Sequence, residues 1–198
     1  MMTATTGRAL KPSDLFSLEH YARARPEFRS RVLEHKKLRN IGVGPNTTWC
    51  FEDRLTVQYQ VQEMLRTERI FEPTGIEEEL QSYNPLIPDG SNLKATLLIE
   101  YTDTEERHRA LERLKGLERR CWLSVGGEKV FGIADEDLER ENDTKTSAVH
   151  FLRFELSPAA CAALKGGALV ELGTDHDAYR YRVTASAPAS RALAADLA

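Results

Sequence analysis

Residues 51–72, FEDRLTVQYQVQEMLRTERIFE, contain neither glycine nor proline. Alternating apolar residues over the first seven positions would also suit a strand, but the uninterrupted continuation favours one helix with Asp53 as a cap. At about 100° per residue, the apolar side chains form a larger and a smaller group. The larger group is Val57, Val61, Met64, Leu65 and Phe71, the smaller is Leu55, Tyr59 and Ile70, and Gln58, Gln62 and Arg69 line the seam. The segment is therefore predicted to pack on two sides.

Glu68 falls in the middle of the larger apolar face of this predicted helix. A buried ionised carboxylate is costly unless a partner offsets the loss of water. An arginine from the preceding helices is the simplest partner, because structural ion pairs often resemble functional sites. The alternative is that Glu68 binds a metal ion together with histidines.

The region before residue 51 predicts helices followed by a hairpin. Residues 1–16 are expected to form a frayed N-terminal arm. Ser17 is predicted to cap a short helix through residue 24, and Pro26 to open a second helix, because proline suits the first helical turn. Residues 40–51 place Gly42 and Gly44 between apolar positions, which indicates a short hairpin or irregular strands. Residues 73–86 then predict a short helix, and residues 84–92 a loop.

The second half of the chain has the two-residue period of strands. Apolar residues alternate over 93–101 and 148–156, CWLSV and KVFGI meet at Gly126 and Gly127, and ALVELGT precedes YRYRVTAS. Helices are predicted after Asp103 and Ser157 and in the tail from Ser190. Strand pairs with few strand–helix–strand alternations predict an α+β fold, a mainly antiparallel sheet with packed helices and an N-terminal helical segment. The length of 198 residues fits a single domain, 1–198.

Composition excludes several classes of protein. Hydrophobic residues make up 41% and charged residues 29% of the chain, which is typical of a globular domain rather than a disordered one. The N-terminus has no apolar signal region and no run is long enough to span a membrane, so we expect a cytoplasmic protein. Three separated cysteines with no CxxC pair predict reduced, mostly buried thiols.

The histidines offer candidates for chemistry. His35 shares a helix face with apolar residues and His150 a strand face, so both are expected inside the fold. Each can be a satisfied core histidine. Together with Glu68 they can instead form a metal site for Fe, Zn or Mn. Glu105 and His108 have Glu-x-x-His spacing, but di-iron sites need two such motifs, so a solvated surface is expected there.

Two segments carry opposite charge. Residues 21–39 hold seven basic residues against two glutamates, and residues 135–143 hold six acidic residues against one arginine. The basic positions spread around the helix rather than forming one stripe, which disfavours nucleic-acid binding, as does the net charge of −4. The two segments can complement each other within the chain or across an interface in a homo-oligomer. The acidic run lacks the ligand order of a calcium loop.

Several stretches taken together resemble the bacterial domain-of-unknown-function family 3501. They are SLEHYARARPEFRSRVLEHKK, FEDRLTVQYQVQEMLRTERIFE, YNPLIPDGSNLKATLLIEY, IADEDLERENDTKTSAVHFLRFEL and GTDHDAY. The similarity covers nearly the whole chain from Ser17. It implies no catalytic residue. It does imply a context, because members are often encoded beside rubrerythrin-like proteins and iron-sulfur oxidoreductases.

Two functions follow from these observations. The first is a non-catalytic accessory or interaction protein of a redox or peroxide-stress system, with an iron-sulfur oxidoreductase or a rubrerythrin-like protein as its partner. The opposed charges could guide that association. The alternative is a small metal- or cofactor-binding oxidoreductase component that uses His35, Glu68 and His150.

Overall fold

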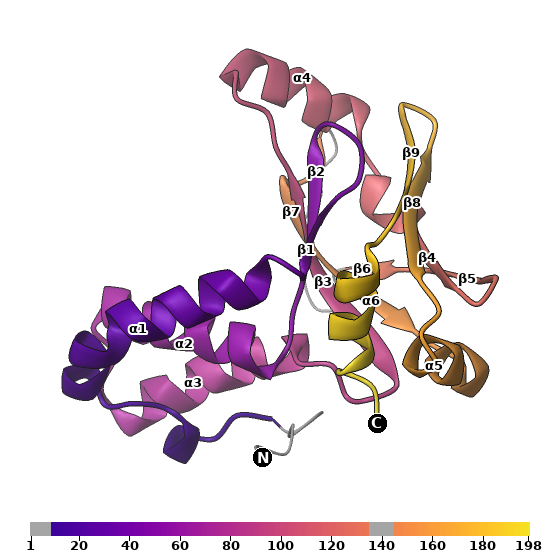
Figure 1. The fold of residues 1–198 in the computed structure, drawn as a ribbon. Helices are drawn as coiled ribbons and strands as arrows, with labels where there is room; N and C mark the ends of the chain where they lie inside the picture. The colour runs from indigo at the N-terminus through magenta and orange to yellow at the C-terminus, as the bar shows by residue number, and fades with distance from the viewer. Residues whose placement is uncertain (1–8, 135–144) are drawn as a thin grey trace.

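The computed structural model describes residues 9–134 and 145–198 and has the predicted α+β fold (Figure 1). One antiparallel sheet has the order β1-β2-β3-β7-β6, and a second has the order β5-β4-β8-β9. The strands are β1 (Asn40–Gly42), β2 (Thr47–Phe51), β3 (Asn92–Ile99), β4 (Cys121–Val125), β5 (Glu128–Phe131), β6 (Ile133–Ala134), β7 (Val149–Glu155), β8 (Val170–His176) and β9 (Tyr179–Thr184). The helices are α1 (Leu18–Lys36), α2 (Arg54–Glu68), α3 (Pro73–Tyr83), α4 (Thr104–Arg113), α5 (Pro158–Lys165) and α6 (Ala187–Ala194).

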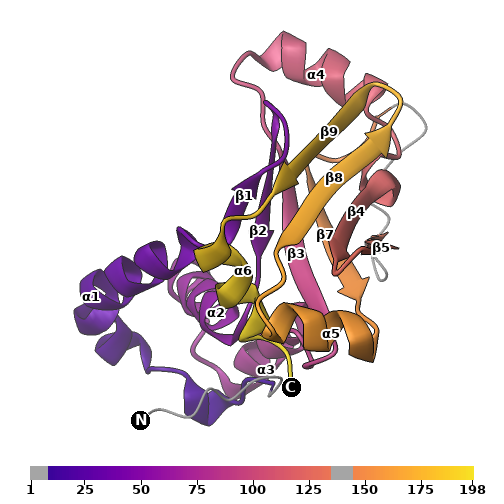
Figure 2. The same cartoon turned by 45° about the vertical axis from the view of Figure 1, so that its right-hand side comes forward.

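The two sheets stack face to face, and their inner faces share the largest apolar core (Figure 2). Alternation along the strands puts Trp49, Leu97 and Phe154 of the first sheet against Leu123 and Leu172 of the second. The Trp49 and Phe154 rings stack with centroids 5.6 Å apart. The alternating strands β3 and β7 were therefore predicted correctly. The β4–β5 hairpin at Gly126 and Gly127 was also predicted correctly, although β4 is buried at all five positions.

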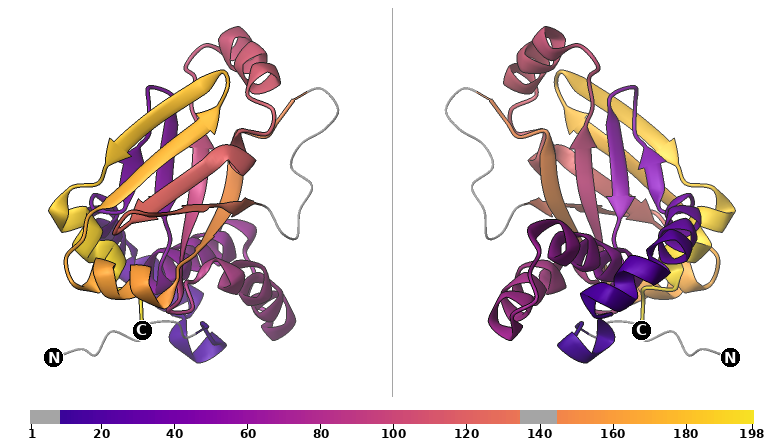
Figure 3. Two further views of the ribbon diagram at one scale, coloured as in Figure 1. Left: turned by 90° about the vertical axis from the view of Figure 1, so that its right-hand side faces the viewer. Right: turned by 90° about the vertical axis from the view of Figure 1, so that its left-hand side faces the viewer.

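Helices α1, α2 and α3 form one group beside the sheet that contains β1, β2 and β3. In the right-hand view of Figure 3 this group lies in front of the lower part of that sheet. The α2 helix packs on two sides, as predicted: Val57, Val61 and Leu65 enter one apolar cluster, while Leu55 and Tyr59 contact another. Its predicted cap is also confirmed, because the Asp53 side chain accepts a hydrogen bond from the Thr56 backbone. No helix of the described residues has the length and apolar character that a membrane span requires.

The prediction of two helices before residue 40 is wrong, because α1 is one continuous helix with Pro26 inside it. Proline removes one backbone donor and usually breaks a helix. Here Tyr21 and Phe28, on either side of Pro26, are both buried and pack edge to face, with ring centroids 6.1 Å apart. This contact on the buried face of α1 joins the helical turns before and after Pro26 and so favours one continuous helix. Ser17 caps the helix as predicted.

The predicted fraying of residues 1–16 is wrong for residues 9–16, which pack along α2 and α3. Leu10 is buried and exchanges two backbone hydrogen bonds with the Asn84 side chain. Phe16 does the same with Gln62, at 2.6 and 3.4 Å, and Gln58 donates to the Asp14 carbonyl at 2.7 Å. The glutamines at the seam of α2 therefore bind the backbone of the N-terminal segment.

We expect Gln62→Ala to lower the free energy of unfolding by about 1 to 3 kcal/mol, because the half-buried backbone of Phe16 would lose both hydrogen bonds to the buried Gln62 side chain. Chemical denaturation monitored by circular dichroism measures the change. Gln60→Ala is the matched control, since Gln60 is exposed on the same helix. Equal stability of the two variants would contradict the role assigned to Gln62.

Candidate functional site

The structure does not bring His35, Glu68 and His150 together. The His35 Nε2 atom lies 2.5 Å from Asp53 Oδ2, at the beginning of α2. Glu68 is the last residue of α2, roughly 20 Å along the helix axis from Asp53. His150 belongs to β7 in the first sheet. Within residues 9–134 and 145–198, no group of three or more His, Cys, Asp or Glu side chains is placed to hold a metal ion.

Glu68 is exposed, so the prediction that its carboxylate is buried is wrong. The helical wheel places it on the apolar face, but α2 ends there: Arg69 adopts a left-handed conformation with φ 55°. Phe71, the next residue assigned to that face, is 67% exposed. The larger apolar face is therefore covered as far as Leu65 and is open to solvent at Glu68 and Phe71.

Glu63, one turn earlier, makes the arginine pair that the sequence analysis assigned to Glu68. Arg25 of α1 donates two hydrogen bonds to the Glu63 carboxylate, at 2.7 and 2.8 Å, and the Tyr21 hydroxyl donates a third at 2.7 Å. The hydrogen bond from Arg25 lowers the pKa of Glu63 to about 2, with a further contribution from Tyr21. This cluster joins α1 to α2, and all its members are paired.

Arg39 forms a second polar cluster at the junction of the helices and the sheets. Only 1% of its side chain is exposed. It donates to the backbone oxygens of Phe51 and Glu52 at 3.0 Å and of Ala192 at 3.2 Å, and it pairs with the Asp196 carboxylate. The guanidinium therefore links the end of α1, the end of β2 and the C-terminal segment.

Two carboxylates share the Arg39 charge, and their pKa values shift in opposite directions. Burial opposes ionisation of Asp53, but the hydrogen bond from His35 and the charge of Arg39 lower its pKa to about 2. Burial raises the pKa of Asp196 to about 6, although Arg39 acts against this. The half-buried His35 is thus held by an ionised acid that also caps α2, so the sequence prediction of an inside position is only partly right for this histidine.

His150 lies inside the fold, as predicted, with 1% of its side chain exposed. Its Nε2 atom is 2.8 Å from the Thr146 hydroxyl, 3.1 Å from the Ser147 carbonyl and 3.8 Å from the Glu118 carboxylate. Thr146 also donates to Glu118 at 3.3 Å. This histidine is therefore bonded within the core, which fits the alternative of a satisfied core residue.

The three cysteines are free, as predicted, but only Cys121 is buried, so the prediction of mostly buried thiols is wrong for Cys50 and Cys161, which are half-buried. Burial raises the pKa of Cys50 to about 11, raises that of Cys121 well above its ordinary value, and raises that of Cys161. A thiol reacts and binds metals as the thiolate. All three side chains are therefore held as neutral thiols at neutral pH.

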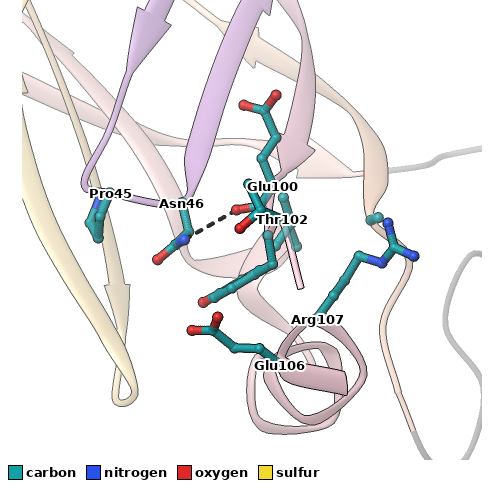
Figure 4. A pocket seen from close by; sticks show the side chains of 9 residues that line it. Pro45, Asn46, Glu100, Thr102, Glu106 and Arg107 are labelled. Atoms are coloured by element: carbon teal, nitrogen blue, oxygen red, sulfur yellow. Dashed lines mark hydrogen bonds between the residues drawn. The ribbon is translucent and has the colours of Figure 1, made fainter. Parts of the chain in front are cut away.

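A groove of about 580 Å³ lies where the β1–β2 turn, the end of β3 and the start of α4 meet (Figure 4). It is lined by Pro45 and Asn46 of the turn, by residues 99–102, by Glu106 and Arg107 of α4, and by Ala148. Its volume lies in the usual range of ligand sites, roughly 300 to 1,000 Å³. Sequence analysis did not identify it, although the Gly-Pro-Asn turn and the Asp103 cap of α4 mark two of its walls.

The turn that forms one wall is held by hydrogen bonds to β9 and β3. The Asn46 backbone donates to the Tyr179 hydroxyl at 2.9 Å, and that hydroxyl donates to the Val43 carbonyl at 2.9 Å. The Asn46 side-chain amide donates to the Glu100 carbonyl at 3.1 Å. Gly44 has φ 76°, and a Cβ there would lie 2.6 Å from the Tyr179 hydroxyl, so the close approach requires glycine.

The groove differs from the other polar clusters because several of its polar groups have no internal partner. Among the residues the structure describes, no hydrogen bond or ion pair engages the side chains of Tyr101, Glu106 or Arg107. Figure 4 shows Glu106 on the Asn46 side of the groove and Arg107 directed to the other side. These groups are available to a bound molecule.

Three of the seven basic residues in segment 21–39 have their charge engaged within the chain. Arg39 is buried, Arg25 is bonded to Glu63, and Lys37 pairs with Glu34 at 2.5 Å. The acidic segment 135–143, predicted to complement it, lies outside the described residues.

Fold and groove together define an α+β protein with two stacked antiparallel sheets, a lateral group of helices and an open polar groove. A family model, "Protein of unknown function (DUF3501)", matches residues 9–197, so the chain belongs to this family. The chain is also similar to a solved structure described as a novel protein of unknown function from Burkholderia pseudomallei. The two are 47% identical with a TM-score of 0.92, over 96% of this chain and all of that one. No curated protein matches the chain.

The Arg39 cluster predicts a pH dependence of stability. The folded-state pKa of Asp196, about 6, lies above the ordinary value, so its contribution is complete below about pH 4 and is lost as pH rises through 6. From pH 7 to 5 the wild type should gain about 1 kcal/mol relative to Asp196→Asn. Asp53 does not titrate in this range, because its pKa is about 2. Urea unfolding at both pH values measures the difference, and parallel stability curves would contradict it.

Glu68→Gln should change the free energy of unfolding by less than about 0.5 kcal/mol, because the side chain is exposed. Glu63→Gln should cost about 1 to 3 kcal/mol, because Arg25 and Tyr21 would lose a charged partner. Thermal and chemical denaturation of both variants makes the comparison. A larger loss in Glu68→Gln than in Glu63→Gln would reverse the assignment.

Proposed function

We propose that this chain is an accessory binding protein of a redox or peroxide-stress system, and that its partner is an iron-sulfur oxidoreductase or a rubrerythrin-like protein. The observation that carries the binding role is the groove, where Tyr101, Glu106 and Arg107 present polar groups that have no partner in the part of the chain that the structure describes. The redox context rests on the family resemblance, which implies neighbouring genes of these two kinds.

The other polar clusters are bonded within the fold, which favours the groove as the place where a partner binds. Arg39 is bonded to three carbonyls and a carboxylate, Glu63 to an arginine and a tyrosine, and His150 to its neighbours in the core. Groups bonded in this way stabilise the fold and have little capacity left for a ligand. The groove is open, and a partner would meet charged side chains with their full bonding capacity.

The positions of His35, Glu68 and His150 do not favour a metal-binding oxidoreductase component. The three side chains lie on separate elements, one is exposed at a helix end, and the histidines are bonded to Asp53 and Thr146. The accessory role therefore remains the better supported function.

The test uses the purified full chain with the purified iron-sulfur oxidoreductase and, separately, the rubrerythrin-like protein encoded in the same genome. Calorimetry and size-exclusion chromatography should detect a complex with one of them. Arg107→Glu should weaken that complex at least about tenfold, because it reverses a charge in the groove. Arg113→Glu is the control, since Arg113 is exposed on the same helix but does not line the groove.

Two outcomes would contradict the proposal. One is that neither candidate forms a complex at low ionic strength, where charged contacts are strongest. The other is a complex that is equally sensitive to Arg107→Glu and Arg113→Glu, which would place the contact outside the groove.

A further inference from the structure

The oxygen acceptors in the lining of the groove favour a ligand that donates hydrogen bonds. Three oxygen acceptors line it and receive no hydrogen bond from residues 9–134 or 145–198. They are the Glu106 carboxylate, the Tyr101 hydroxyl and the Asn46 side-chain carbonyl. The orientation of the Asn46 amide is fixed, because its nitrogen donates to the Glu100 carbonyl at 3.1 Å. Its oxygen is therefore the atom left for a ligand.

The charges of the groove favour a cation. Glu100 and Glu106 against Arg107 give the lining a net charge of −1. Glu100 is partly engaged, since one of its oxygens accepts a hydrogen bond from Thr48 at 2.6 Å, while Glu106 is not. Arg107 lies on the opposite side of the groove from Asn46 (Figure 4), so it leaves the acceptor side negative.

A lysine ammonium matches this acceptor set. It has three donors and no acceptor, so three oxygens around it satisfy it completely. Ile99, Ala148 and the Tyr101 ring supply apolar surface for its methylene stem, as lysine side chains commonly require. The exposed positions of Thr102, Glu106 and Arg107 leave the groove open, which suits a side chain presented by another protein.

We propose that the groove binds a lysine side chain of a partner protein, with the ammonium between Glu106, Asn46 and Tyr101. Arg107 then pairs with an acidic residue two positions from that lysine in the partner. This inference rests on the proposed function and adds the chemistry by which the partner is recognised.

The experiment titrates the ¹⁵N-labelled full chain with the peptide acetyl-Ala-Lys-Ala-Glu-Ala-amide, followed by NMR. The lysine peptide should shift the amide signals of Asn46, Tyr101 and Glu106. A peptide with norleucine in place of lysine should bind about tenfold more weakly, because it keeps the stem and lacks the ammonium. Glu106→Gln should remove this preference, and Glu105→Gln, an exposed neighbour that does not line the groove, should keep it.

Equal binding of the lysine and norleucine peptides, or no shift at the groove signals, would overturn the lysine assignment. Stronger binding of 1,4-diaminobutane than of the peptide at the same residues would also overturn it, in favour of a small-molecule amine. These results are separate from the test of the proposed function. A protein complex that is weakened by Arg107→Glu but unaffected by Glu106→Gln would keep the accessory role and reject the lysine.

Discussion

The buried guanidinium of Arg39 is the interaction on which the arrangement of the molecule depends. A charge without water is strongly unfavourable unless hydrogen bonds and an opposite charge replace the solvent. Here the replacements come from the end of β2, from α6 and from Asp196 near the C-terminus. Because these groups are up to 157 residues from Arg39 in sequence, they can meet it only when the helices, the first sheet and the C-terminal segment are all in place. The Arg39 charge is therefore fully bonded only in the correctly assembled fold.

Local patterns in the sequence predicted most of the elements, because the information for them is local. The Asp53 cap, the two-sided helix after it and the alternation in β3 and β7 each depend on neighbouring residues and were correct. The errors occurred where tertiary contacts outweigh local preference. Pro26 is accommodated inside α1 by packing, and residues 9–16 are ordered by glutamines that are more than 40 residues away.

The candidate site was harder to predict for the same reason. The helical wheel assigned the paired carboxylate of α2 to Glu68, and this was wrong, because the arginine pair is made by Glu63. Which carboxylate is paired depends on where the helix ends and which turn α1 covers. The burial of His150 followed from strand alternation, whereas its distance from His35 depends on how the helices and sheets join. The groove is formed by a turn at residues 45–46 and by a strand end and helix that follow about 50 residues later, so no local spacing or motif reveals it.

The contacts that hold the walls of the groove lower the cost of binding a partner there. Binding costs less when the groups that contact a partner are already ordered. The Asn46 wall is fixed by Tyr179 and Glu100, and α4 is fixed by Ala110, Leu111 and Leu114, which pack with Ile99 and Tyr179 in one apolar cluster. The walls of the groove are thus held by contacts within the fold, and its rim carries side chains that have no partner among the described residues. A partner that supplies the matching charges would order only those side chains, and the rest of the fold would stay as it is.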